Sequence, residues 1–215
     1  MTTARRNSGM APVSAGERLH TPAALNNREP ILRVLRRLVE AGQSVLEIGS
    51  GTGVHVAYFA REYPEVHWRP SDPDGAMRAS VSAWCSDLGK NVDPPLDLDV
   101  RAVAWWQGVA GPVDAVLSIN MLHVAPPDAF AGLAGGSARL LPPGGLLALY
   151  GPFRFNGQCC GTGNKRFDAM LRGQNAAWGL RDLNDIAAQG AAAGLGLERV
   201  VDMPAGNHML LLRRR

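Results

Sequence analysis

A short apolar run that leads into three glycines at alternate positions constrains the fold of this chain most strongly. Residues 44–48 form the run, Gly49, Gly51 and Gly53 follow, and apolar residues then recur with helical spacing over 56–60. Because glycine has no Cβ, the chain can turn sharply there, and a ligand can lie against bare backbone. The pattern predicts a strand, a ligand-binding turn and a helix.

Strand-like and helical segments alternate along the rest of the chain. A first helix is predicted to begin near Asn26 and Asn27, with Pro30 in its first turn, and to stop at Gly42. Further strands are predicted over 66–72, 96–100, 113–119 and 145–150, helices over 76–88, 128–140 and 182–193, and a closing hairpin over 197–203 and 208–212. Such alternation is typical of a parallel sheet covered on both faces. We therefore expect an α/β, Rossmann-like fold with a seven-stranded, mostly parallel sheet, a C-terminal antiparallel hairpin and helices on both faces.

The length of 215 residues suits one domain. Residues 1–20 carry few apolar residues and are expected to form a disordered tail, which leaves 21–215 as a single domain. Within it, residues 151–181 are rich in Gly, Asn and Arg and contain one short helical pattern, over 164–172. Long connections in compact domains are usually functional or mobile, so this insertion is predicted to be a lid or a substrate wall.

Charge and cysteine content exclude several classes of function. The ends of the chain supply six of the 22 basic residues and Glu17, which leaves 16 basic and 18 acidic residues between them. A basic surface for nucleic acid is therefore not expected, and no apolar run is long enough for a membrane span. Three cysteines without CxxC spacing predict neither a disulfide framework nor a metal site, and they fit a cytoplasmic protein.

Two aspartates extend the glycine turn into a candidate adenosine site. Asp72 ends the second predicted strand, where a carboxylate can accept hydrogen bonds from ribose hydroxyls, and Asp99 ends the third, where it can accept from an adenine amine. Each also fits an aspartate that caps the next helix. The glycine spacing does not match the dinucleotide fingerprint, because Val54 and Val56 stand at the positions of its last glycine.

These motifs resemble those of class I methyltransferases that use S-adenosylmethionine (SAM), and in particular the methyltransferase-like family of unknown function that includes methyltransferase-like protein 26. The segments that carry the resemblance are 27–31, 47–55, 70–74, 120–123, 150–153, 164–168 and 178–182. The resemblance implies the class I methyltransferase fold and SAM as the cofactor. The cofactor-binding residues expected from the glycine turn, the aspartates and the matching segments are Asn27, Arg28, Glu47, Gly49, Ser50, Gly51, Gly53, His55, Asp72, Asp99, Asn120 and Met121.

Candidate catalytic residues follow the fourth and fifth predicted strands. His123 is a candidate general base, because a neutral imidazole can take the proton that an attacking hydroxyl or thiol loses. Asn120 is a candidate for holding the methionine part of SAM or the acceptor, and Tyr150 for lining the sulfonium. Each also has a structural interpretation: His123 as a buried hydrogen-bonded residue, Asn120 as a turn residue and Tyr150 as a core aromatic.

The expected activity is transfer of a methyl group from SAM to oxygen, nitrogen or sulfur of a small molecule. The chain lacks the Asn/Asp-Pro-Pro-Tyr signature of many amino-methyltransferases, which disfavours a nucleic-acid substrate. Two alternatives remain open: a SAM-binding protein without turnover that acts through a partner, and an enzyme that uses SAM for an intramolecular displacement. The protein is expected to be a monomer or a homodimer.

Overall fold

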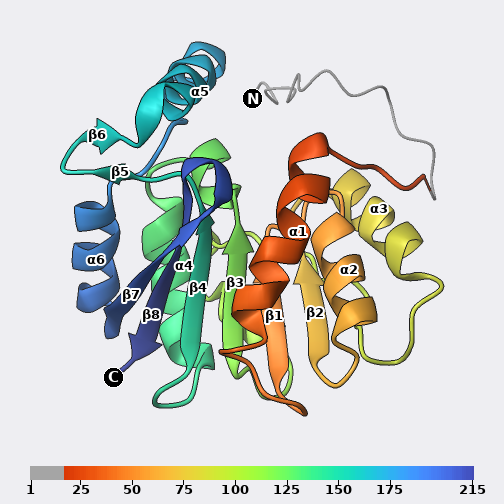
Figure 1. Ribbon diagram of the computed structural model, residues 1–215. Helices are drawn as coiled ribbons and strands as arrows, with labels where there is room; N and C mark the ends of the chain where they lie inside the picture. The colour runs from red at the N-terminus through yellow and green to blue at the C-terminus, as the bar shows by residue number, and fades with distance from the viewer. Residues whose placement is uncertain (1–16) are drawn as a thin grey trace.

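The computed structural model describes residues 17–215, which form one six-stranded sheet, a two-stranded hairpin and surrounding helices (Figure 1). The strands of the large sheet are β1 (Ser44–Ile48), β2 (His67–Ser71), β3 (Ala115–Ile119), β4 (Leu146–Gly151), β7 (Leu195–Met203) and β8 (Asn207–Arg214). The α-helices are α1 (Pro22–Leu35), α2 (Val54–Glu62), α3 (Gly75–Cys85), α4 (Ala129–Leu140), α5 (Gly161–Gln174) and α6 (Leu183–Ala192).

The strands lie in the order β2-β1-β3-β4-β8-β7. The first four are parallel, with Val45 paired to Trp68 on one side and to Ala115 on the other, whereas β8 runs antiparallel to both β4 and β7. The carboxyl ends of β1, β2, β3 and β4 therefore meet at one edge of the sheet. This arrangement confirms the predicted α/β class, the mostly parallel sheet and the antiparallel pair at the C-terminus.

Helices cover both faces of the sheet, and each face has its own apolar core. Val45 belongs to the core under α1, α2 and α3, whereas the next residue, Leu46, belongs to the core under α4 and α6. Neighbouring residues of a strand point to opposite faces, so a sheet that is buried on both sides has uninterrupted apolar strands. Burial of every residue of β1, β3 and β4 agrees with this.

The prediction of seven strands is wrong by one, because residues 96–100 do not form a strand. They contribute a single bridge, Ser71 to Leu96, beside β2. The backbone from Asn91 to Leu96 does hydrogen-bond to β2, but Pro94 and Pro95 interrupt it. Proline has no amide hydrogen to donate to a sheet ladder, so the pairing breaks into isolated bridges.

The first helix also begins earlier than the pattern around Asn26 suggests. Thr21 caps α1 by accepting a hydrogen bond from the amide of Ala24, and Pro22 is the first helical residue. Pro30, which was expected in the first turn, lies inside the helix. A capping threonine followed by proline is a usual helix start, so the actual start was visible in the sequence.

Residues 151–181 contain β5 (Arg154–Phe155), β6 (Gln158–Cys159) and α5. In Figure 1 this segment extends beyond the carboxyl ends of the parallel strands, and α5 lies at its outer end. Only Asn164 and Leu171 of α5 are buried. Helix α5 is therefore attached to the domain through few buried side chains, whereas Phe153 and Leu180 are buried near the two ends of the segment.

The predicted tail over 1–20 falls largely outside the described residues. Its last part, 17–20, forms neither helix nor strand, yet it is hydrogen-bonded to α3: Leu19 donates its amide to Ser80, and Arg18 donates to the carbonyl of Ala83 at 2.8 Å. Arg18 also pairs with Asp87. Residues 17–20 thus lie along α3.

Candidate active site

The glycine turn between β1 and α2 has the left-handed backbone that its sequence requires. Gly49, Gly51 and Gly53 have φ angles of 72°, 54° and 88°. A Cβ at Gly53 would lie 2.7 Å from the Cα of Val81, and one at Gly49 would lie 2.7 Å from the Cγ of Met121. No atom of the described residues lies within 4 Å of a Cβ at Gly51. The turn is thus packed from α3 and from the end of β3, and it opens at its centre.

Asp72 holds the turn in place from the end of β2. Its Oδ2 accepts a hydrogen bond from the amide of Gly51 at 2.9 Å, and its Oδ1 accepts one from Asp74. The amide of Ser50 donates to the carbonyl of Ser71, and the Ser50 hydroxyl accepts from the Ser71 amide. The predicted pair of glycine turn and second-strand carboxylate therefore lies together.

Glu47, in the middle of β1, is a buried acid without a counterpart. Its side chain is 1% exposed, and within residues 17–215 neither carboxylate oxygen has a hydrogen-bond partner. Burial raises its pKa to about 7; the nearby Ser50 hydroxyl opposes the shift, and the charge of Asp72 adds to it. Removing a carboxylate from water disfavours its charged form unless a cation or donors replace the water.

Asn120 and Tyr150 lie side by side where β3 and β4 end. The amide of Asn120 donates to the carbonyl of Tyr150 at 2.8 Å, and Asn120 adopts a left-handed conformation with φ of 58°. A Cβ at Gly151 would come within 3.0 Å of the Asn120 Oδ1. Non-glycine residues in this conformation are uncommon and concentrate at functional sites.

His123 is buried in the short helix η2 (Met121–Val124) and makes edge-on contact with Phe153. Both ring nitrogens lack a hydrogen-bond partner within residues 17–215, and a Cβ at Gly151 would collide with Nε2. Burial, assisted by the charge of Arg181, lowers its pKa to about 3, although Asp168 opposes this. The imidazole is therefore neutral at physiological pH.

Helix α1 covers the site with Asn27. The Asn27 Oδ1 lies 2.7 Å from Nε2 of His55, the second residue of α2, and the same side chain hydrogen-bonds to Tyr150. Burial raises the pKa of Tyr150, and this bond partly offsets the shift. Burial and the charge of Arg28 lower the pKa of His55 to about 4. Asn27 thus links α1 to α2 and to the end of β4.

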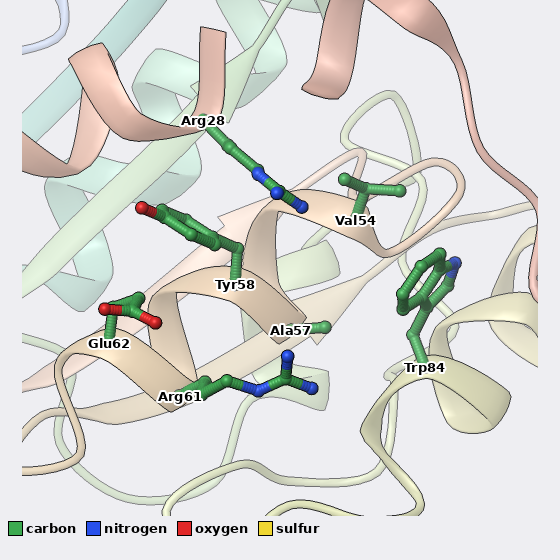
Figure 2. A pocket seen from close by; sticks show the side chains of 7 residues that line it. All are labelled: Arg28, Val54, Ala57, Tyr58, Arg61, Glu62 and Trp84. Carbon is green, nitrogen blue, oxygen red and sulfur yellow. The ribbon is translucent and has the colours of Figure 1, made fainter. Parts of the chain in front are cut away.

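Two residues predicted for the cofactor site have other contacts in the structure. Arg28 lies over the ring of Tyr58, 4.6 Å from its centroid, and lines a cavity among α1, α2 and α3 (Figure 2). Asp99 accepts hydrogen bonds from the amide, Nε and Nη2 of Arg101. Arg101 in turn lines a groove of about 420 Å³ beside α4.

Sequence reasoning missed two residues that hold the site together. Ser80, fully buried in α3, donates to the carbonyl of Thr52 in the glycine turn at 2.8 Å. Arg181 donates to the carbonyl of Leu122 at 3.0 Å and so ties the 151–181 segment to η2. Arg181 falls in a segment that carried the family resemblance, whereas a lone serine in a helix gives no such signal.

These features fit a site for a cationic nucleoside. The turn is open at Gly51, Asp72 offers carboxylate oxygens beside it, and Glu47 is a buried carboxyl group whose oxygens lack a hydrogen-bond partner among residues 17–215. In the described part of the chain, no group of three or more His, Cys, Asp or Glu side chains is placed to hold a metal ion. Nor is any helix over residues 17–215 long and apolar enough to cross a membrane.

Comparison with solved structures places the fold among methyltransferases. An O-methyltransferase family protein from Burkholderia thailandensis matches with a TM-score of 0.75 at 19% identity, covering 89% of this chain and 57% of that one. An O-methyltransferase family 2 protein from Planctomyces limnophilus in complex with apigenin matches with a TM-score of 0.74 at 18% identity, covering 90% and 58%. The methyltransferase CalO1 of calicheamicin biosynthesis, in its SAH-bound form, matches with a TM-score of 0.72 at 16% identity, covering 88% and 54%.

The likeness defines the fold class as the Rossmann-like fold of class I methyltransferases, and the chain spans little more than half the length of these proteins. At the level of sequence, a family model described as "Protein of unknown function (DUF938)" matches residues 18–214. The chain belongs to this family.

Proposed function

We propose that this protein binds SAM at the carboxyl edge of its sheet and transfers the methyl group to oxygen, nitrogen or sulfur of a small molecule. The observation that carries the proposal is the buried carboxylate of Glu47, whose oxygens have no hydrogen-bond partner within residues 17–215. It lies beneath a glycine turn that Asp72 holds in place. A bound ligand with a positive charge and ribose hydroxyls would supply a countercharge for Glu47 and hydrogen-bond donors for Asp72. The methyltransferase fold and the narrower resemblance to the family of methyltransferase-like protein 26 support the same assignment.

In this proposal the residues of the turn bind the cofactor. Asp72 would hold the ribose, Glu47 would favour the positive charge, and Ser50 and the three glycines would keep the backbone close to the ligand. Asp99 would reach the adenine only after exchanging its bonds with Arg101. SAM, when bound, supplies an electrophilic methyl group on a sulfonium.

Residues at the carboxyl ends of β3 and β4 would position the acceptor. Met121 adjoins the turn, because it approaches Gly49, and Asn120 approaches Gly151 at the end of β4. Displacement at a methyl carbon depends chiefly on alignment of donor and acceptor in a dry site. Tyr150, at the end of β4, and Asn27, on α1, would contribute to that alignment.

His123 would receive the acceptor's proton or hydrogen bond. Its neutral imidazole can accept, but a pKa of about 3 makes full proton transfer unfavourable while the ring stays buried. His123 can therefore act as the base only when a bound acceptor changes the surroundings of the ring and so raises its pKa. An acceptor that is already nucleophilic, such as a neutral amine or a thiolate, needs positioning alone.

Incubation of the protein with SAM and a metabolite extract tests the proposal. Mass spectrometry should detect S-adenosylhomocysteine together with a product heavier by one methylene, and Asp72→Ala should form much less of both at a SAM concentration that does not saturate the parent. Methylthioadenosine without a methylated product would indicate intramolecular displacement. SAM binding without any turnover would favour the non-catalytic alternative.

A further inference from the structure

A cavity of about 180 Å³ among α1, α2 and α3 has two arginines in its wall (Figure 2). In Figure 2 the guanidinium group of Arg28, from α1, lies above Ala57, and that of Arg61, from α2, lies below it. Arg28 is half-buried, and Arg61 is exposed. The aromatic side chains of Tyr58 and Trp84 form further parts of the wall. The cavity is thus a small recess with two arginines and two aromatic rings in its wall.

Neither guanidinium group has a hydrogen-bond acceptor among the residues that the structure describes. Within residues 17–215, Arg28 and Arg61 form no hydrogen bond and no ion pair; Arg28 only lies over Tyr58. By contrast, Arg33 on the same helix as Arg28 pairs with Glu29 at 2.7 Å. Residues 1–16 contain no Asp or Glu. That segment therefore has no carboxylate side chain to offer the two arginines.

One carboxylate, that of Glu62, lines the cavity together with the two arginines, so the lining is positive. Outside the lining, Asp87 pairs with Arg18 and also interacts with the charge of Arg61. In Figure 2 the carboxylate of Glu62 lies beside Tyr58, away from both guanidinium groups. Both guanidinium groups are positively charged, and an anion between them would be attracted to both. The planar guanidinium fork also matches the oxygens of phosphate and carboxylate groups.

We propose that this cavity is a binding site for a small oxyanion, a phosphate or a carboxylate group, held by Arg28 and Arg61. Its volume is below the range of about 300–1,000 Å³ typical of pockets for drug-sized ligands, so a nucleoside does not fit. The site is distinct from the proposed cofactor site and does not depend on methyl transfer. It also gives Arg28 a different role from the one expected from the sequence.

Isothermal titration of the full chain with inorganic phosphate, at constant ionic strength, tests the proposal. We expect saturable binding, weakened at least about tenfold in Arg28→Gln and in Arg61→Gln, as for loss of one charge-assisted hydrogen-bond partner. Arg37→Gln, a change at an exposed arginine outside the cavity, is the matched control and should bind as the parent does. A parallel titration with acetate identifies which oxyanion the site prefers.

Three results would overturn the proposal. The first is no saturable binding of either anion, and the second is binding that both cavity variants retain. The third is competition between phosphate and SAM together with loss of SAM affinity in Arg61→Gln, which would make the cavity part of the cofactor site. Phosphate binding as expected with no binding of SAM would instead sustain this proposal and refute the proposed function.

Discussion

Replacing Glu47 with glutamine should remove a large part of the pH dependence of stability. The pKa of Glu47 is raised from an ordinary value of 4.5 to about 7 by burial. A folded state that holds a proton more tightly than the unfolded state gains stability at low pH and loses it as pH rises through the folded pKa. The difference between these two pKa values corresponds to about 3 kcal/mol in the free energy of unfolding.

Equilibrium urea unfolding between pH 4.5 and 8.5 measures this directly. The free energy of unfolding of the parent, taken relative to Glu47→Gln at each pH, should fall by about 3 kcal/mol between the two ends of that range. The comparison cancels groups common to both proteins, such as His55. Glu62→Gln, at an exposed position of α2, serves as the control and should follow the parent. Parallel profiles for the parent and Glu47→Gln would refute the reasoning.

Two further predictions concern the acceptor side of the site. Because the pKa of His123 is about 3, methyl transfer should show no loss of rate with a midpoint near pH 6.5; a midpoint near 6.5 would contradict the low pKa. If the ring is the base, His123→Ala should cost about 100-fold or more in turnover, and unchanged turnover per folded molecule would contradict that role. In hydrogen exchange measured by mass spectrometry, the amides of α5 should exchange faster than those of β3 and β4. Their exchange should slow down only when cofactor and acceptor are both bound. If α5 is as protected as the strands without ligand, the segment is a fixed part of the domain.

The cofactor side of the fold could be predicted from local sequence because its determinants are local. The run at 44–48 and the three glycines leave one conformation for the turn, and the carboxylate at the end of the next strand must reach it. β1 has the predicted bounds, and Asp72 bonds the turn as a strand-end carboxylate can. Backbone requirements of this kind do not depend on distant packing.

Other features depend on packing that a single sequence does not display. Asn27 and Arg28 are neighbours, but successive helical residues point about 100° apart, so only one of them faces His55 while the other faces Tyr58. The orientation of α1 about its own axis, relative to α2, decides which of the two residues faces His55. The missing strand at 96–100 is a different case, because Pro94 and Pro95 already argued against an uninterrupted ladder.

Calorimetric titration of the protein with SAM tests the central claim most directly. The account predicts saturable binding of SAM, no binding of NAD, and a loss of about 10- to 100-fold in SAM affinity in Asp72→Ala, the cost of a hydrogen bond to a charged group. Asp74→Ala, a change at a half-buried residue whose side chain caps α3, is the matched control and should retain most of the affinity. Equal binding of NAD, or an Asp72→Ala variant that binds SAM as the parent does, would contradict the account.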